Sequence, residues 1–126
     1  MIVVDTSALM AILLDESGSD ALRAVLEAEA VVISAGTLAE ALIVAQGRNL
    51  GPEMSELVEA LGLEVAPLTA GAARKMAQAC ARWGKGVDWA GLNLGDCFAY
   101  VTAQEHGCPL LFVGGHLKKT DMVAAI

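Results

Sequence analysis

Residues 93–113, NLGDCFAYVTAQEHGCPLLFV, predict a helix and a strand in succession. Asn93 is a residue type that favours the start of a helix, and Gly107 is the type that most often follows the end of one. The spacing therefore predicts a helix over residues 93–107. The apolar run 109–113 follows at once, and such a run is typical of a strand that is buried on both faces of a sheet.

The same succession of strand and helix extends along the rest of the chain. Apolar runs predict further strands at residues 2–5, 31–34 and 63–68, with a weak candidate edge strand at 121–126. Helical spacing and cap residues predict further helices at residues 6–14, 17–30, 36–49, 51–62 and 69–84. This alternation predicts one three-layer α/β/α domain, residues 1–126, with a central parallel sheet of four to five strands.

Cap residues suggest where several of these helices start and stop. Ser17 and Ser19 are candidate N-caps of the second helix, and Thr37 opens a candidate capping box in the third. Pro52 and Gly62 stand just inside the start and just past the end of the fourth, which is the expected asymmetry.

The composition limits the class of protein. The chain is 56% hydrophobic with a mean hydropathy of +0.56, which excludes disorder and suffices for a core. Charges interrupt every apolar run, and the N-terminus lacks the basic segment of a signal peptide, so we expect a cytoplasmic protein without a membrane helix. Three cysteines without a CxxC pair favour reduced, packed thiols over a disulfide framework or a zinc site.

The net charge of −7 argues against a simple nucleic-acid binder, because such proteins usually carry a basic excess or a long basic stripe. Nucleic acid remains compatible with this charge if metal ions offset a cluster of acids locally.

Three carboxylates are candidates for one edge of the sheet. Asp5 ends the first strand, Glu40 lies one helical turn beyond the second, and Asp96 lies in the first turn of the helix before the last. Ligands of parallel α/β sheets bind outside the carboxyl ends of the strands. Carboxylates brought together repel one another unless a cation is present, and oxygen ligands suit Mg²⁺ or Mn²⁺.

Each carboxylate also has a purely structural interpretation. Asp5 can help to cap the first helix, Glu40 can complete the capping box of Thr37, and Asp96 can pair with Asn93 at a helix start. From spacing alone, a joint metal site and three separate caps are about equally supported.

Four segments together carry a resemblance. They are VVDTSAL at 3–9, ISAGTLAEALIV at 33–44, AGLNLGDCFAYVTAQEHGCPLLFVG at 90–114 and KKTDM at 118–122. In this order they resemble the PIN-domain family, and within it the VapC-type ribonuclease toxins of bacterial type II toxin–antitoxin systems. The resemblance implies a metal-dependent endoribonuclease that hydrolyses RNA to 5′-phosphate and 3′-hydroxyl ends. It also implies inhibition by a cognate VapB-type antitoxin and a homodimeric state.

The resemblance also assigns roles to individual residues. It implies catalytic carboxylates that bind Mg²⁺ or Mn²⁺ at Asp5, Glu40 and Asp96. Thr6 or Ser7 would orient Asp5 through a hydroxyl hydrogen bond. Asn93 would contact substrate or a water of the metal as well as cap its helix.

The chain departs from the family after its last strand, where the family has a pattern similar to G-(D/N)-D-F-x-x-T-D. The stretch GGHLKKTD, residues 114–121, keeps Gly114, Thr120 and Asp121 but has His116 at the acidic position. Thr120 and Asp121 are expected to support the site.

Three interpretations of His116 remain open. Three carboxylates suffice and His116 contacts substrate, which we favour; or His116 is itself a ligand, which suits Mn²⁺ better than Mg²⁺. In the third, the protein is a degenerate, weakly active or inactive PIN domain that binds RNA or antitoxin.

Aromatic and basic residues offer further contacts to RNA. Trp83 and Trp89 flank the glycine-bearing loop 84–92, and Lys118 and Lys119 follow His116 closely. The tryptophans can stack on an unpaired base or pack under the loop, and the lysines can touch phosphates or stay solvated.

Overall fold

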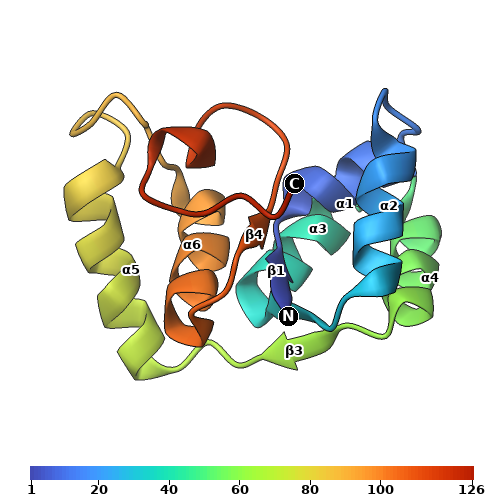
Figure 1. Ribbon diagram of the computed structural model, residues 1–126, viewed down its shortest axis with the longest axis horizontal. Helices are drawn as coiled ribbons and strands as arrows, with labels where there is room; N and C mark the ends of the chain where they lie inside the picture. Colours follow the sequence, from blue (N-terminus) through green and yellow to red (C-terminus); the bar gives the residue numbers. More distant parts are fainter.

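The computed structural model describes residues 1–126, and its centre is one sheet of four parallel strands in the order β3-β2-β1-β4 (Figure 1). The strands are β1 (Ile2–Val4), β2 (Val31–Ser34), β3 (Glu64–Ala66) and β4 (Leu110–Leu111). The helices are α1 (Thr6–Leu13), α2 (Ser19–Ala28), α3 (Ala35–Gly47), α4 (Gly51–Leu61), α5 (Ala70–Trp83), α6 (Leu94–His106) and the short 3₁₀ turn η1 (Leu117–Lys119). The predicted α/β/α class with a parallel sheet is confirmed.

Alternate residues of the strands bury their side chains in two separate cores. Val4 and Ile33 pack in one core with helices α1 to α4, whereas Val3 and Val32 pack in the other with α5, α6 and Leu117. Because successive side chains of a strand point to opposite faces, continuous apolar runs are what a sheet covered on both faces requires. Helices α2 and α4 accordingly lie on the right of the sheet in Figure 1, and α5 and α6 on the left.

The register of the strands brings their carboxyl ends to one edge. Val3 of β1 pairs with Val32 on one side and with Leu110 on the other, all in parallel. Asp5, which follows β1, therefore lies at the same edge as the segment that follows β4.

Several predicted helix ends are confirmed. Thr69 caps α5 through its side chain, and Asn93 caps α6 in a reciprocal capping box with Asp96. Gly62 and Gly107 end their helices in the left-handed conformation, with φ of 61° and 60°. These are local signals, so the sequence suffices to place them.

Two predicted helix starts are wrong. Helix α2 begins after Gly18, whose φ is 87°, without any side-chain cap, and Ser19 instead bonds to Asp15. Helix α3 is capped by Ser34, which accepts a hydrogen bond from the backbone N–H of Gly36. The predicted capping box at Thr37 therefore does not form, because that residue already lies inside the helix.

The last strand is shorter than predicted. Strand β4 covers only Leu110–Leu111, and the chain then turns at Gly114, which has a φ of 110°. The predicted edge strand at 121–126 contributes a single parallel bridge, between Leu110 and Ala124. The sheet thus has four strands, the lower end of the predicted range.

The three cysteines are free, as the sequence predicts. Cys97 is buried, while Cys80 and Cys108 are half-buried, and the Sγ atoms of Cys80 and Cys97 lie 3.1 Å apart between α5 and α6. Burial raises the pKa of Cys97 to about 12, so it remains a thiol at neutral pH. None of the helices combines the length and the apolar character that crossing a membrane requires.

We predict that Thr37→Val stabilises the protein. Thr37 is fully buried, and its hydroxyl has no hydrogen-bond partner, so the side chain bears a desolvation cost without compensation. Valine keeps the shape and removes that cost, which should raise the free energy of unfolding by about 1 kcal/mol. Urea denaturation measures the change. Thr37→Ala is the control, since it leaves a cavity and should destabilise; a Thr37→Val protein less stable than wild type would contradict the prediction.

Candidate active site

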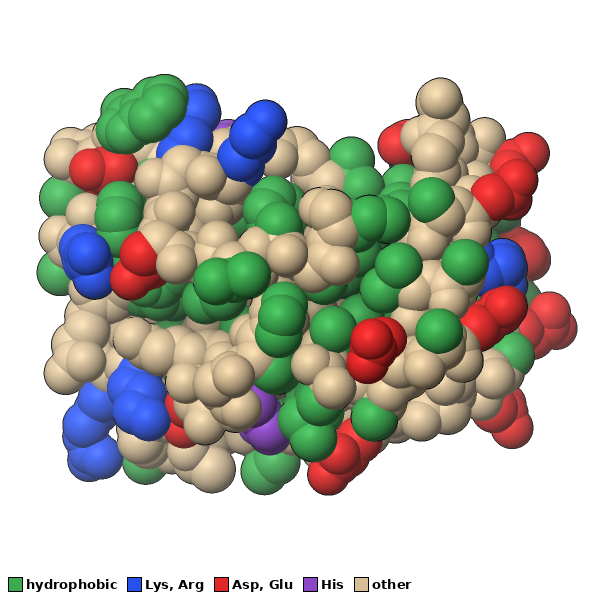
Figure 2. All heavy atoms as spheres, in the orientation of Figure 1, with side chains coloured by type: hydrophobic (Ala, Val, Ile, Leu, Met, Phe, Trp, Pro, Cys, Tyr) green, Lys and Arg blue, Asp and Glu red, His purple; other side chains and the backbone are tan.

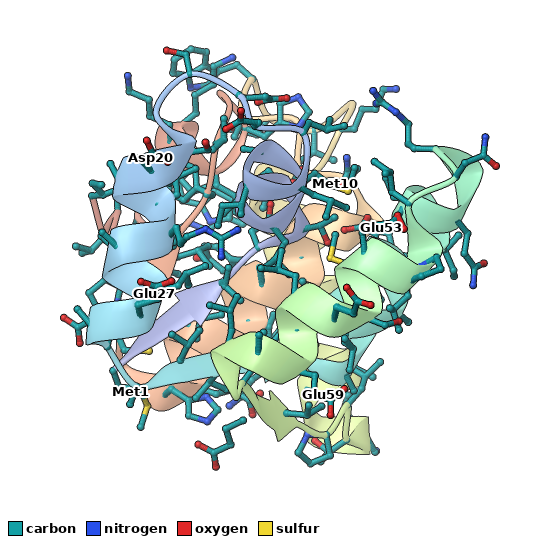
Figure 3. All side chains as sticks on the ribbon, turned by 90° about the vertical axis from the view of Figure 1, so that its right-hand side faces the viewer. Met1, Met10, Asp20, Glu27, Glu53 and Glu59 are labelled. Atoms are coloured by element: carbon teal, nitrogen blue, oxygen red, sulfur yellow. The ribbon has the colours of Figure 1, made fainter.

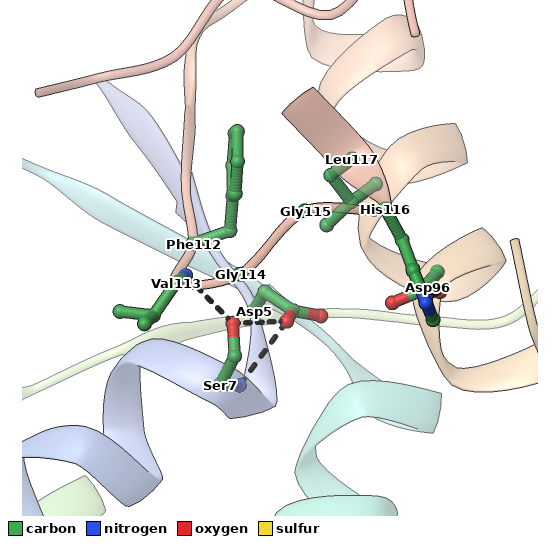
Figure 4. A pocket seen from close by; sticks show the side chains of 9 residues that line it. All are labelled: Asp5, Ser7, Asp96, Phe112, Val113, Gly114, Gly115, His116 and Leu117. Carbon is green, nitrogen blue, oxygen red and sulfur yellow. Dashed lines mark hydrogen bonds and ion pairs between the residues drawn. The ribbon is translucent and has the colours of Figure 1, made fainter. Parts of the chain in front are cut away.

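A cavity of about 210 Å³ opens where β1 and β4 end (Figure 4). Asp5 and Ser7 line it from the start of α1, and Asp96 lines it from the first turn of α6. The segment from Phe112 to Leu117 completes the wall. Two of the three predicted carboxylates therefore meet in one pocket, although 91 positions separate them in the chain.

Asp5 is a buried carboxylate, only 4% exposed. Its Oδ2 caps α1 by accepting hydrogen bonds from the backbone N–H of Ser7 at 3.1 Å and from the Ser7 hydroxyl at 2.6 Å. Burial nevertheless raises the pKa of Asp5 to about 6, and the nearby charges of Asp96 and Glu40 add to the rise. The structural role and a role in a charged site therefore coexist in this residue.

Ser7 connects the two strand ends that form the pocket. Its hydroxyl donates to Asp5 and accepts from the backbone N–H of Val113 at 2.9 Å (Figure 4). The donated proton fixes the Asp5 carboxylate, and the accepted one fixes the segment that follows β4. Of the two hydroxyls considered for orienting Asp5, Ser7 makes the bond.

Thr6, the other hydroxyl, bonds to Glu40 instead. Its Oγ1 donates to Oε1 of Glu40 at 2.6 Å, from α1 to α3. Oε2 of Glu40 lies against Gly95, because a Cβ built at Gly95 would collide with the Glu40 carboxylate. Glu40 is therefore not among the residues that line the cavity, yet its charge still raises the pKa of Asp5.

Gly95 also shapes the site, although no motif in the sequence points to it. Any side chain at this position would displace Glu40. The only local signal is a glycine in the first turn of a helix, between Asn93 and Asp96, where glycine has no conformational advantage.

Asp96 is held by the capping box of α6 and by the histidine. Its Oδ2 accepts from the backbone N–H of Asn93 at 3.1 Å and faces Nδ1 of His116 at 3.0 Å. The two carboxylates lie across the pocket from each other, with His116 on the side of Asp96 (Figure 4). The side chain of His116 is 54% exposed, yet it is held in place by its contact with Asp96.

Thr120 and Asp121 lie outside the pocket. The Thr120 hydroxyl donates to the carbonyl of Leu117 and so closes the η1 turn. Asp121 accepts a hydrogen bond from the Tyr100 hydroxyl at 2.7 Å and pairs with Arg82 at 3.4 Å. Both residues fix the C-terminal segment, and neither brings an oxygen to the cavity.

The donors at this edge suit an oxygen-preferring cation only in part. Asp5 and Asp96 supply carboxylates to the cavity, and a buried ionised carboxylate such as Asp5 is stabilised by a cation. No three His, Cys, Asp or Glu side chains lie close enough together to hold a metal ion as they stand. The arrangement fits an ion held by one or two carboxylates that keeps several waters, which is the usual behaviour of Mg²⁺.

Comparison with known proteins identifies the family. The model of the PIN domain matches residues 2–122. The chain belongs to the PIN domain family. Ribonuclease VapC36 of Mycobacterium tuberculosis is 41% identical over 126 residues, which cover 95% of this chain and 90% of that protein. Ribonuclease VapC of Mycolicibacterium smegmatis is 37% identical, covering 97% of this chain and 98% of that protein. This PIN domain therefore falls within the VapC ribonuclease family.

Solved structures agree with this fold. The PIN domain superimposes on VapC20 of Mycobacterium tuberculosis, a sarcin-ricin loop cleaving toxin, with a TM-score of 0.79 at 15% identity, covering 98% of this chain and 97% of that one. It also matches a toxin–antitoxin complex from Klebsiella pneumoniae, with a TM-score of 0.64 at 20% identity and coverage of 87% and 83%. At these identities the likeness establishes the fold alone.

We predict that Asp5→Asn stabilises the metal-free PIN domain. A pKa of about 6 in the fold against 3.8 means that the folded state binds the Asp5 proton more tightly than the unfolded state. The contribution of the Asp5 carboxyl to the free energy of unfolding is therefore fully present below pH 4. It is lost as the pH rises toward 6 and stays low at higher pH. Asparagine removes the loss, so the free energy of unfolding should rise by up to about 3 kcal/mol at pH 8 and by roughly half of that at pH 5.

Urea denaturation in EDTA at the two pH values measures both gains. Glu56→Gln, on the exposed face in the middle of α4, is the control and should change neither. A gain that is equal at pH 5 and pH 8, or a loss at pH 8, would rule out a raised pKa at Asp5.

Proposed function

We propose that the protein is a cytoplasmic endoribonuclease toxin of the VapC type that depends on Mg²⁺ or Mn²⁺. The observation that carries the proposal is the buried carboxylate of Asp5, which faces Asp96 across a pocket at the carboxyl ends of parallel strands. The names of the relatives supply the reaction class, because curated proteins at 36–41% identity are VapC ribonucleases.

The proposed ion binds to Asp5 and Asp96, with Glu40 as a third carboxylate within reach of the same edge. The chemistry that such an ion supplies is activation of water and neutralisation of charge on a phosphoryl group. Asn93 would contact the substrate from the exposed start of α6, three residues before Asp96.

The surrounding residues would position these carboxylates. Ser7 holds Asp5 with two hydrogen bonds, and Thr6 holds Glu40 with one. The backbone N–H of Asn93 holds Asp96. Fixed donors of this kind reduce the reorganisation that the reaction needs, because the charges already stand where the phosphodiester is to bind.

We further propose an antitoxin of the VapB type as the inhibitory partner, and a homodimer as the working state. The likeness to a protein of a toxin–antitoxin complex supports the first proposal. The second follows from membership of the VapC family alone.

A degenerate PIN domain is the second candidate, and the contact of His116 with Asp96 favours it. His116 stands where the family has an acid, and it engages the Oδ2 of Asp96 at 3.0 Å. A histidine bonded to a metal-binding carboxylate competes with the metal for the same oxygen. In that case the protein would bind RNA or antitoxin without cutting.

The first test is cleavage of RNA by the purified protein. We expect cleavage in Mg²⁺ or Mn²⁺ and none in EDTA, and we expect Asp5→Asn and Asp96→Asn to lower kcat/KM roughly 100- to 1000-fold, the usual scale for one electrostatic contact in an active site. Glu56→Gln should cut as wild type does. Failure to cleave in either metal, or cleavage by both aspartate variants at the wild-type rate, would refute the enzyme. Turnover of a small phosphate ester without RNA cleavage would instead indicate another phosphoryl hydrolase.

The second test separates the interpretations of His116. His116→Asp restores the family's acid and also removes the partner of Asp96, so we expect kcat/KM in Mg²⁺ to rise about tenfold, equivalent to about 1.4 kcal/mol. His116→Ala frees Asp96 without adding an acid and serves as the matched control. Loss of Mn²⁺-dependent cleavage in both variants would show that His116 itself binds the metal or the substrate.

A further inference from the structure

One large aromatic side chain is exposed beside the candidate active site. Trp89 lies in the loop between α5 and α6 and is 75% exposed, the largest fraction among the exposed large hydrophobic residues. The Nζ of Lys119 stands 4.7 Å from the centre of its ring, in a cation–π contact. Trp89 therefore does not pack under its loop, and what holds it is a basic residue of the η1 turn.

The other tryptophan of this region has a different environment. Trp83 is half-buried, its Nε1 donates to the Tyr100 hydroxyl at 3.1 Å, and Arg82 covers its ring at 4.4 Å. Trp83 is thus a structural residue between α5 and α6. Trp89 is the more exposed of the two rings, and it makes no hydrogen bond to the rest of the fold.

The pair of Trp89 and Lys119 borders the pocket. A Cβ built at Gly115 would lie 4.0 Å from Cε of Lys119, and Gly115 itself lines the cavity. We call Trp89 and Lys119 together the platform. Gly115 connects the platform to the wall of the cavity.

The charge of the molecule is divided between two sides. Residues 1–64 hold eleven Asp and Glu against two Lys and Arg, whereas residues 65–126 hold four against six. Basic side chains gather on the left of Figure 2 and acidic ones on the right, and the acidic side includes Asp20 and Glu27 of α2 with Glu53 and Glu59 of α4 (Figure 3). The net charge of −7 therefore conceals a mildly basic side, to which the platform belongs.

We propose that Trp89 and Lys119 form a binding platform for an unpaired nucleotide of the RNA substrate, next to the nucleotide that enters the carboxylate pocket. An exposed aromatic ring can stack on any base, and a neighbouring ammonium can hold the adjacent phosphate. Stacking requires a base that is free of a duplex, so the platform selects single-stranded loops or ends. This inference rests on the proposed ribonuclease function.

The first measurement is binding of a mixed-sequence, unstructured, dye-labelled RNA by fluorescence anisotropy, carried out in the Asp5→Asn background to slow cleavage. Tryptophan fluorescence is a second readout in the protein that keeps Trp89. We expect RNA to quench Trp89, and Trp89→Ala to weaken binding roughly 5- to 150-fold, the range that follows from about 1–3 kcal/mol per stacked base. Trp89→Phe should restore most of the affinity. Val87→Ala is the matched control, since Val87 is 65% exposed in the same loop and should have no effect.

Lys119→Met and a duplex RNA complete the test. The lysine variant should weaken binding severalfold and make its salt dependence shallower, because one phosphate contact is lost. Trp89→Ala should leave the binding of a fully paired RNA unchanged. Unaltered binding of unstructured RNA by Trp89→Ala would overturn the platform and leave this surface to a protein partner. Equal weakening for single- and double-stranded RNA would also overturn it.

Cleavage kinetics keep the platform separate from the ribonuclease proposal. If wild type cuts RNA, Trp89→Ala should raise KM with little change in kcat, and an unchanged KM would refute the platform alone. If wild type does not cut RNA yet binds it through Trp89, the platform stands and the ribonuclease proposal fails.

Discussion

The burial of the Asp5 carboxylate at the end of a central strand is the constraint on which the rest of the site depends. A buried carboxylate needs hydrogen-bond donors, and Ser7 supplies two of them while also binding the backbone at Val113. The Asp5 carboxylate therefore caps a helix, is connected through Ser7 to the segment after β4, and carries a buried charge that a cation would stabilise. Because these roles share one carboxylate, the fold and the candidate chemistry cannot be separated at this residue.

The start of α6 is the second element that combines structure and chemistry. Asn93 and Asp96 satisfy each other's backbone N–H groups, and this fixes the carboxylate at the pocket. Gly95 lies between them and leaves room for Glu40 from α3. The helix cap thus fixes the position of Asp96, whereas the position of Glu40 requires a glycine at residue 95.

His116 and the platform both arise from the segment that follows β4. This segment turns away from the sheet at Gly114, which sends His116 toward Asp96 and places Lys119 over Trp89. His116 stands where the family has an acid, and it contacts the carboxylate of Asp96. The candidate site consequently has fewer anionic ligands, and its rim gains a cationic and an aromatic contact.

Local sequence signals suffice to predict the alternation of strands and helices, the cap at Asn93 and the position of Asp5 at a strand end, because they act between residues that are near neighbours in the chain. These signals misplaced the start of α3, since Ser34 and Thr37 are both suitable caps and only the packing of the helix decides between them. The tertiary structure alone decided that Ser7 rather than Thr6 bonds Asp5, that His116 bonds Asp96 and that Trp89 stays exposed. Each of these depends on contacts or solvent exposure set by segments far apart in sequence, which no local pattern encodes.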